Sequence, residues 1–114
     1  MLRLTTRGIR TATAIRDRES FNTSGSMSAR TYPDGGLGPG AVYNSWLNED
    51  EKQVFYVHCY AIDYAVWSYA TPIAWHWTNG EHSGWHVVSQ KFSSTTTKHQ
   101  SNLYMIPREE SAAS

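Results

Sequence analysis

The chain has 114 residues, the usual size of one domain, and a formal net charge of zero. This balance permits nucleic-acid binding without favouring it, and the single cysteine, Cys59, excludes an internal disulfide. No apolar stretch approaches the ~20 residues of a membrane span, so we expect a soluble, cytoplasmic protein.

The first thirty residues are basic, with six arginines against two acids. Residues 1–16 are rich in Arg and Thr and lack acids, which is the composition of an organellar transit peptide. The alternative is a short amphipathic surface helix within residues 5–18, with Ile9 and Ile15 packed inward. We favour the helix because the run of arginines continues into a segment that also contains acids.

A loop rich in Gly and Pro follows this basic segment. Residues 26–31 alternate in character and predict a short strand, whereas residues 33–40 (PDGGLGPG) cannot hold regular structure. We therefore predict a basic N-terminal arm with the Gly/Pro loop over residues 1–40, an aromatic-rich core over 41–106 and a flexible tail over 107–114.

The start of a helix is indicated at Asn48. This residue can cap a helix, acids follow it, and Glu51 occupies the capping-box position. Residues 53–60, however, have high strand propensity. We favour a helix over residues 49–60, because the cap has a definite mechanism and tertiary packing often overrides propensity.

Three strands are predicted after this helix, over residues 64–69, 73–77 and 85–89. Pro72 removes a ladder donor and indicates a bend or bulge, and residues 78–84 have turn chemistry. If the last hairpin closes symmetrically, period-two alternation defines two faces. The expected core face carries Trp75, Trp77, Trp85 and Val87, and the other face carries His76, His86 and Val88, with Trp77 opposite Trp85 and His76 opposite His86.

A final helix is predicted from Thr95 to about Met105, with Ser94 as its cap and Pro107 as its stop. The elements together predict an α+β fold. We expect a small antiparallel sheet of three to four strands with two or three short helices in a single domain.

The start of this last helix is the main candidate for a binding site. Hydroxyls, two lysines, a histidine and a glutamine crowd a helix N-terminus, where free N–H groups and the helix dipole favour anions. The competing interpretation is a well-capped helix with a solvated polar face. The candidate binding residues are Lys91, Ser93, Ser94, Thr95, Thr96, Thr97, Lys98, His99 and Gln100, together with Arg7 and Arg10 of the basic arm.

Metal binding and catalysis have weaker support. The inferred pair of His76 and His86 supplies two ligands where structural zinc needs four, so we expect no metal and no cofactor. Cys59 has no identifiable base, and Asp63 is a lone acid, so no catalytic residue is expected. An enzyme would need a pocket in which a carboxylate reaches His76 or His99.

Three motifs resemble a family of small bacteriophage proteins, many of them from phages of actinobacteria. The motifs are YAVWSYATPIAW at residues 64–75, WHVV at 85–88 and KFSSTTTKHQ at 91–100. The family has a SYxTPIAW strand, a tryptophan-containing strand and a YSxTTSxHQ segment. This chain departs from it at Phe92, at Thr97 and in a longer turn before Trp85.

The resemblance covers about residues 63–100 and implies a phage or prophage origin, but no reaction. It also implies one recurring unit, which is either a site or an internal hydrogen-bond network that fixes the last helix on the sheet. This unit includes Ser68, Thr71, Ser93, Thr95, Thr96, His99 and Gln100. The residues expected to be structural are Trp67, Ser68, Tyr69, Thr71, Pro72, Trp75, Trp77 and Trp85.

Two functional hypotheses follow. The first is a non-enzymatic nucleic-acid-binding module, which requires a positive face joining Arg7, Arg10, Lys91 and Lys98 and an affinity that falls steeply with salt. The alternative is a protein-binding modulator of a host or phage partner, which requires an exposed aromatic patch and little salt dependence. An enzyme is a weaker third hypothesis, and the oligomeric state is left open.

Overall fold

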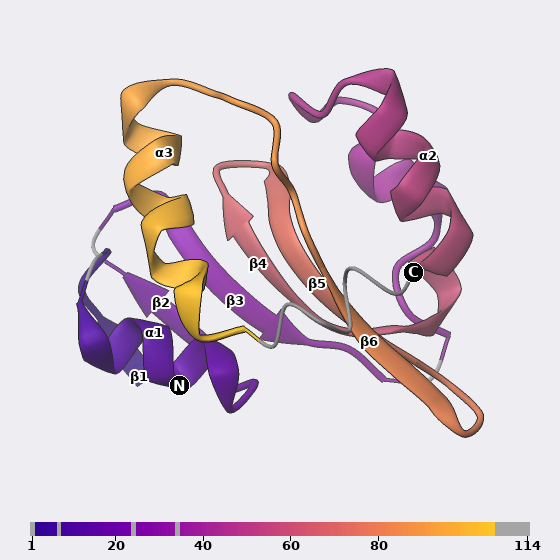
Figure 1. Cartoon of the computed structure of the whole chain (residues 1–114), viewed down its shortest axis with the longest axis horizontal. Helices are drawn as coiled ribbons and strands as arrows, with labels where there is room; N and C mark the ends of the chain where they lie inside the picture. The colour runs from indigo at the N-terminus through magenta and orange to yellow at the C-terminus, as the bar shows by residue number, and fades with distance from the viewer. Residues whose placement is uncertain (1, 7, 24, 34, 107–114) are drawn as a thin grey trace.

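The computed structural model of this chain describes residues 2–6, 8–23, 25–33 and 35–106. The tail predicted over 107–114 and the candidate residue Arg7 lie outside them. The elements, with η for 3-10 helices, are β1 (Leu2–Leu4), α1 (Ile9–Arg16), β2 (Phe21–Thr23), β3 (Met27–Thr31), η1 (Pro39–Val42), α2 (Glu49–His58), η2 (Cys59–Ala61), β4 (Ile62–Ser68), β5 (Thr71–Asn79), β6 (His82–Val87), α3 (Ser94–Gln100) and η3 (Ser101–Met105) (Figure 1).

The strands form one six-stranded sheet in the order of the sequence, β1 to β6. The pair β1–β2 is parallel and is joined through α1, and the other pairs are antiparallel. The predicted α+β class is confirmed, but the prediction of three to four strands was too low. The missed strands β1 and β2 have three residues each, too few for a period-two pattern, and β1 pairs with a strand that lies beyond α1.

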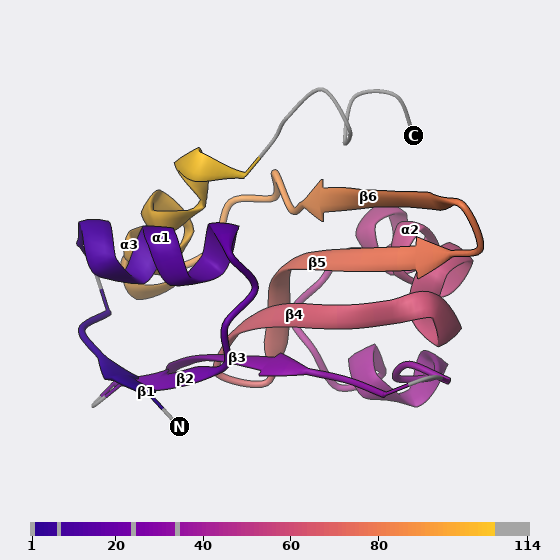
Figure 2. The same cartoon turned by 90° about the horizontal axis from the view of Figure 1, so that it is seen from below.

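Helices cover both faces of the sheet. Figures 1 and 2 show α1 and α3 on one side, and α2 lies on the other. This produces two apolar cores, so β4 and β5 are buried on both faces and read as nearly continuous apolar runs. The first core includes Ile15, Phe21, Met27, Tyr64, Ile73, Trp85 and Leu103, and the second includes Val42, Leu47, Phe55, Ile62, Trp75 and Val88.

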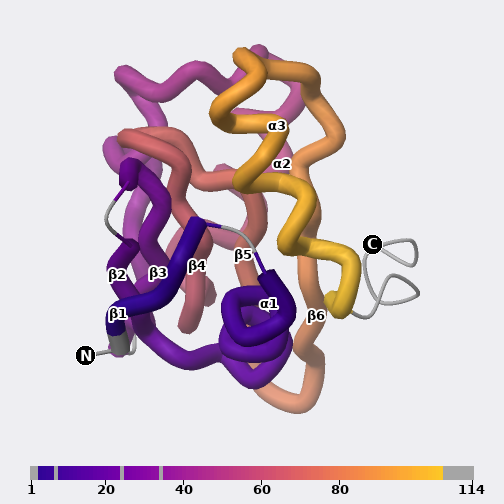
Figure 3. Tube along the Cα trace, turned by 90° about the vertical axis from the view of Figure 1, so that its left-hand side faces the viewer, coloured from indigo at the N-terminus to yellow at the C-terminus, as the bar shows by residue number. Residues whose placement is uncertain are grey.

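The segment predicted as a basic arm contributes β1, α1, β2 and β3 to this sheet and its first core. The short predicted helix exists, but only one of its two expected inward residues is buried. Ile15 is inaccessible to solvent, whereas Ile9 is 66% exposed. The side chain of Asn102 fastens this region to η3, because its Nδ2 donates to the carbonyl of Thr6 at 2.7 Å. Figure 3 shows α1 and the C-terminal helical segment side by side.

The caps of α2 and α3 explain where these helices begin. Asn48 caps α2 as predicted, because its Oδ1 accepts a hydrogen bond from the backbone N–H of Glu51 at 2.9 Å. The helical assignment is therefore confirmed, with the α-helix ending at His58. The cap of α3 is Ser93 and not Ser94 as predicted, since Ser93 Oγ accepts from the N–H of Thr96.

The register of the β5–β6 hairpin differs from the symmetrical prediction by one residue. Trp75 pairs with His86 and His76 pairs with Trp85. The loop is shorter than expected because it consists of Gly80 and Glu81 alone, with Gly80 at φ 65°. A shift of one residue moves every side chain of a strand to the other face. The predicted faces were thus wrong: Trp75 packs in the second core and Trp85 in the first.

Two loop predictions are confirmed in modified form. A register shift between Val66 and Trp67 marks a bulge in β5 at Ile73, next to Pro72. The Gly/Pro segment remains outside the strands, but the prediction that residues 33–40 hold no regular structure was wrong at its end, because η1 begins at Pro39. Gly36 packs closely on η2. A Cβ on Gly36 would collide with the backbone carbonyl of Cys59, which also accepts a hydrogen bond from the N–H of Leu37 at 2.8 Å.

Candidate functional site

The polar start of α3 is joined to the sheet by buried hydrogen bonds. Ser68 Oγ lies 2.7 Å from His99 Nδ1 and 3.0 Å from Thr96 Oγ1. All three side chains are at most 2% exposed. Burial lowers the pKa of His99, which favours the neutral imidazole that a hydroxyl partner suits. These contacts correspond to the internal network anticipated for the recurring unit.

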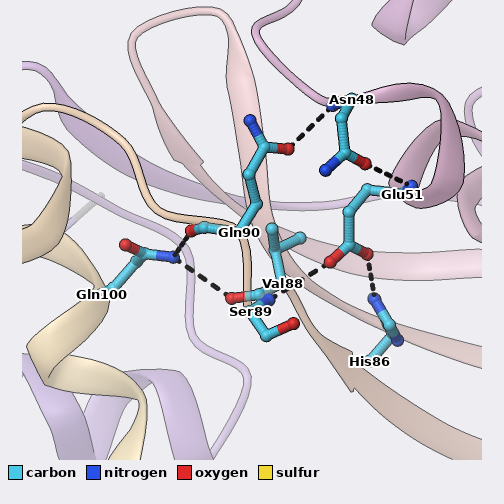
Figure 4. Close-up of polar contacts among 7 residues, drawn as sticks. All are labelled: Asn48, Glu51, His86, Val88, Ser89, Gln90 and Gln100. Atoms are coloured by element: carbon cyan, nitrogen blue, oxygen red, sulfur yellow. Dashed lines mark hydrogen bonds and ion pairs between the residues drawn. The ribbon is translucent and has the colours of Figure 1, made fainter.

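Two glutamine side chains fasten the segment between β6 and α3, one to the segment before α2 and the other to α3. Gln90 accepts from the N–H of Asn48 at 2.7 Å and donates to the carbonyl of Trp46 at 2.8 Å. Gln100 Nε2 donates to the carbonyls of Val88 and Gln90 (Figure 4). The segment between β6 and α3 is therefore held on both sides, and Gln100 acts as a structural residue here.

The remaining candidates of this segment are on the surface. Those exposed to solvent are Lys91, Ser93, Ser94, Thr95, Thr97 and Lys98. Arg10 is exposed on α1, which packs against η3, whereas Lys91 precedes the opposite end of α3. Arg7, the other arginine that the nucleic-acid hypothesis requires, lies outside the described residues, so the positive face stays a prediction.

An exposed aromatic pair lies at the same end of the sheet. The ring centroids of Trp46 and Tyr69 are 5.3 Å apart, and the two side chains are 53% and 48% exposed. Trp46 is positioned by its backbone N–H, which donates to Thr71 Oγ1 at 2.9 Å. The ring of Tyr69 also lies 6.4 Å from that of His99. Figure 1 shows the β4–β5 turn near the segments that lead into α2 and α3.

Tyr69 has a strained backbone. Its φ is 57°, in the left-handed region that residues with a Cβ rarely adopt. The turn is fixed on both sides, because Ser68 pairs with Thr71 and the N–H of Tyr69 donates to the carbonyl of Ser26 at 2.9 Å. Strain of this kind concentrates at functional positions, where the surrounding structure maintains it.

The charges around the aromatic pair are mixed. Lys91 follows Gln90, the residue that binds the carbonyl of Trp46. Glu49 and Asp50 are exposed in the first turn of α2, three and four residues after Trp46. One lysine and two carboxylates therefore stand close in the sequence to residues that hold or carry the pair.

A partly buried contact between a carboxylate and a histidine fastens α2 to β6. Glu51 Oε1 lies 2.7 Å from His86 Nε2, and Glu51 Oε2 accepts from the N–H of Ser89 at 3.2 Å (Figure 4). Burial alone would raise the pKa of Glu51, but the hydrogen bond and charge of His86 and the Ser89 N–H lower it overall. Burial, aided by the charge of His86, also lowers the pKa of His58.

A second polar cluster joins α1 to the sheet. Asp63 Oδ1 lies 2.7 Å from His76 Nδ1, and Asp63 Oδ2 accepts from Thr78 Oγ1 at 2.8 Å. Arg18 Nη1 reaches His76 Nε2 at 2.7 Å. One part of the condition set for an enzyme, a carboxylate within reach of His76, is thus met geometrically. His76 is 3% exposed, however, so it can orient Asp63 but offers no surface to a substrate.

The motif residues expected to be structural are mostly buried in the sheet. Trp67 Nε1 donates to the hydroxyl of Tyr32 at 2.8 Å, while Trp75 is fully buried. Tyr69 is the exception, because its side chain lies on the surface. Among the described residues, no group of three or more His, Cys, Asp or Glu side chains is placed to hold a metal ion.

Trp46 was missed by the sequence analysis. One signal was available, since it stands between polar residues in Asn44-Ser45-Trp46-Leu47-Asn48, just before a predicted helix cap. A tryptophan in such a segment has no obvious core position. Asp63 was noted only as a lone acid, because the bulged pairing that brings it to His76 cannot be inferred from spacing.

A family described as "Family of unknown function (DUF8033)" matches residues 15–105 of the chain. No curated protein and no solved structure matches it. Within the part of the chain that the structure describes, no helix combines the length and the apolar character needed to cross a membrane.

Proposed function

The chain belongs to this family of unknown function, and we propose that it is a non-enzymatic module that binds a partner protein through Trp46 and Tyr69. The observation that carries the proposal is the exposed aromatic pair, with ring centroids 5.3 Å apart. Trp and Tyr are the side chains most enriched among interface residues that dominate binding energy.

Two features support a binding role for this pair. Each ring is about half exposed, although the protein has two apolar cores that could bury aromatic side chains. Tyr69 also keeps a left-handed backbone that an Asn or Gly would adopt at lower cost. Conformational strain that presents an aromatic side chain to solvent is expected where that side chain contacts a partner.

The surrounding charges favour a protein over a nucleic acid. A polyanion that stacked on Trp46 would approach the exposed carboxylates of Glu49 and Asp50. A protein interface, in contrast, commonly has a polar rim of both signs around an aromatic centre. The zero net charge of the chain agrees with this choice, since phosphate binding usually requires a positive bias.

Single-stranded nucleic acid is the second candidate. Lys91 adjoins the residue that holds Trp46, and exposed aromatic rings can stack bases. This arrangement supports the interpretation of Lys91, Lys98 and the hydroxyl-rich segment as a binding surface. Its affinity would fall steeply with salt, whereas the affinity for a protein would change little.

The proposal also includes the setting of the protein. The resemblance of residues 63–100 to small bacteriophage proteins supports a phage or prophage origin. The partner would then be a bacterial or phage protein in the cytoplasm of the host.

The experiment is a pull-down from bacterial lysate, with and without nuclease and at low and high salt. The bait is the wild-type chain, Trp46→Ala or the control Tyr104→Ala, which removes a ring that is 62% exposed on η3. We expect a protein partner that survives nuclease and the control substitution but is lost with Trp46→Ala. Loss of every partner on nuclease treatment would support the nucleic-acid alternative instead. Retention of the partner by Trp46→Ala would contradict the proposal.

A further inference from the structure

A polar pocket of about 450 Å³ lies at the end of the sheet where β4 begins and β5 ends. Tyr32, Tyr60, Asp63, Thr78 and Asn79 contribute to its wall. Its volume is in the range of pockets that hold small molecules. It is separate in the fold from the β4–β5 turn that carries Tyr69, because it borders the opposite ends of these two strands.

The wall of this pocket is held by backbone contacts. The N–H of Tyr32 donates to the carbonyl of Asp63 at 2.9 Å, and the N–H of Leu37 donates to that of Cys59 at 2.8 Å. Gly36 lies so close to η2 that any side chain there would collide with it. These contacts fix Tyr32, Gly36 and Leu37 beside η2 and the start of β4, on one side of the pocket.

The carboxylate of Asp63 is oriented by residues on both sides. His76 holds Oδ1 at 2.7 Å and Thr78 holds Oδ2 at 2.8 Å. Arg18 Nη1 lies 2.7 Å from His76 Nε2 and 3.1 Å from His76 Nδ1, so the guanidinium packs against the imidazole that contacts Asp63. Arg18 keeps this position with a strained φ of 57°, directly after α1, where glycine is usual.

The charge of the pocket indicates the kind of ligand. Asp63 supplies a negative charge, and the described residues that line the pocket include no lysine or arginine. Each carboxylate oxygen has one hydrogen bond from the protein described above and can accept another. Tyrosine rings in the wall can also attract a cation. We propose that this pocket binds an organic cation, an alkylammonium or guanidinium group, whose N–H groups donate to Asp63.

This inference does not depend on the proposed function, because it uses other residues at another end of the sheet. The cationic group can belong to a free small molecule or to a basic side chain of a peptide. Both sources present the same chemistry to Asp63, so the experiment includes a probe for each.

The test is an NMR titration of the full chain with butylammonium, ethylguanidinium and a blocked arginine peptide, with butanol as the neutral probe. We expect saturable shifts around Asp63 with cations at roughly 1–10 mM, and none with butanol. Asp63→Asn should weaken cation binding roughly tenfold or more. The control Asp50→Asn removes an exposed carboxylate from α2 and should leave binding unchanged.

A second variant covers the case in which Asp63→Asn fails to fold. Tyr60 is 67% exposed, so Tyr60→Ala should preserve the fold while weakening cation binding several-fold. A preference for the arginine peptide over the small cations identifies a peptide ligand, and the reverse identifies a free one. The inference is overturned if no cation binds, if butanol binds equally well, or if Asp63→Asn and Tyr60→Ala, once folded, both bind like the wild type.

Discussion

Replacing Ser68 by alanine tests whether the polar start of α3 is a structural network. Ser68 is fully buried, and its hydroxyl contacts both His99 Nδ1 at 2.7 Å and Thr96 Oγ1 at 3.0 Å. Ala removes one oxygen, leaves almost no cavity, and takes a partner from two buried polar groups. Each such loss costs about 1–3 kcal/mol. Because Thr96 keeps a weak contact with Ser93 at 3.5 Å, we expect a total of about 2–3 kcal/mol.

The assay is urea denaturation followed by tryptophan fluorescence, supported by thermal unfolding. A loss of this size corresponds to a fall in melting temperature of roughly 8–12 °C for a domain of this length. Thr97→Ala is the matched control, because Thr97 is exposed on the same helix and should change stability by about 0.5 kcal/mol or less. Equal stability of Ser68→Ala and the wild type would refute the network interpretation.

Three further predictions concern the rest of the molecule. Glu51→Gln should lower the free energy of unfolding by about 2 kcal/mol at neutral pH in urea denaturation, because the partly buried bond to His86 loses its charge. That difference should shrink in acid. The pKa of Glu51 is lowered in the folded chain, so the stability that its carboxylate contributes is fully present above the unfolded pKa and is lost as the pH falls through the folded pKa. Burial lowers the pKa values of His58 and His99 in the folded chain. Below a pH of about 6.5 the unfolded chain therefore takes up protons more readily than the folded chain, and the free energy of unfolding should fall. A free energy of unfolding that stays constant from pH 7.5 to 5 would contradict this. Tyr69→Asn should raise the free energy of unfolding by up to about 1 kcal/mol, because the backbone strain is relieved, and should still lose the partner in the pull-down.

Much of the fold could be predicted because local signals and tertiary packing agree. Asn48 followed by acids defines the start of α2 against the strand propensity of the residues after it, and the cap contact of 2.9 Å shows why. Pro72 likewise predicts the bulge in β5. The same local logic failed at Ser94, because two adjacent serines offer the same cap and spacing cannot choose between them.

The rest depended on information that a local pattern does not contain. The strands β1 and β2 are too short to show a period, and they exist because they pair with each other and with β3. The faces of the β5–β6 hairpin were assigned wrongly because a two-residue loop replaces the longer expected one, and a one-residue shift exchanges the faces.

The candidate sites show the same division. The composition of the segment around Ser93 identified a polar unit, but only the packing reveals that Thr96 and His99 turn inward to Ser68. The aromatic pair joins Trp46 to Tyr69 across 23 residues of chain through tertiary contact alone. No spacing rule connects such positions, so the sequence could supply each residue but not their combination.

The central claim is that the surface around Trp46 contacts a partner protein. Photo-crosslinking tests it most directly, with a photoreactive amino acid placed at position 46 in one sample and at position 104 in another. After irradiation in nuclease-treated lysate, we predict one major protein adduct from position 46 and none of that adduct from position 104. Equal adducts from both positions, or an adduct to nucleic acid alone in untreated lysate, would contradict the claim.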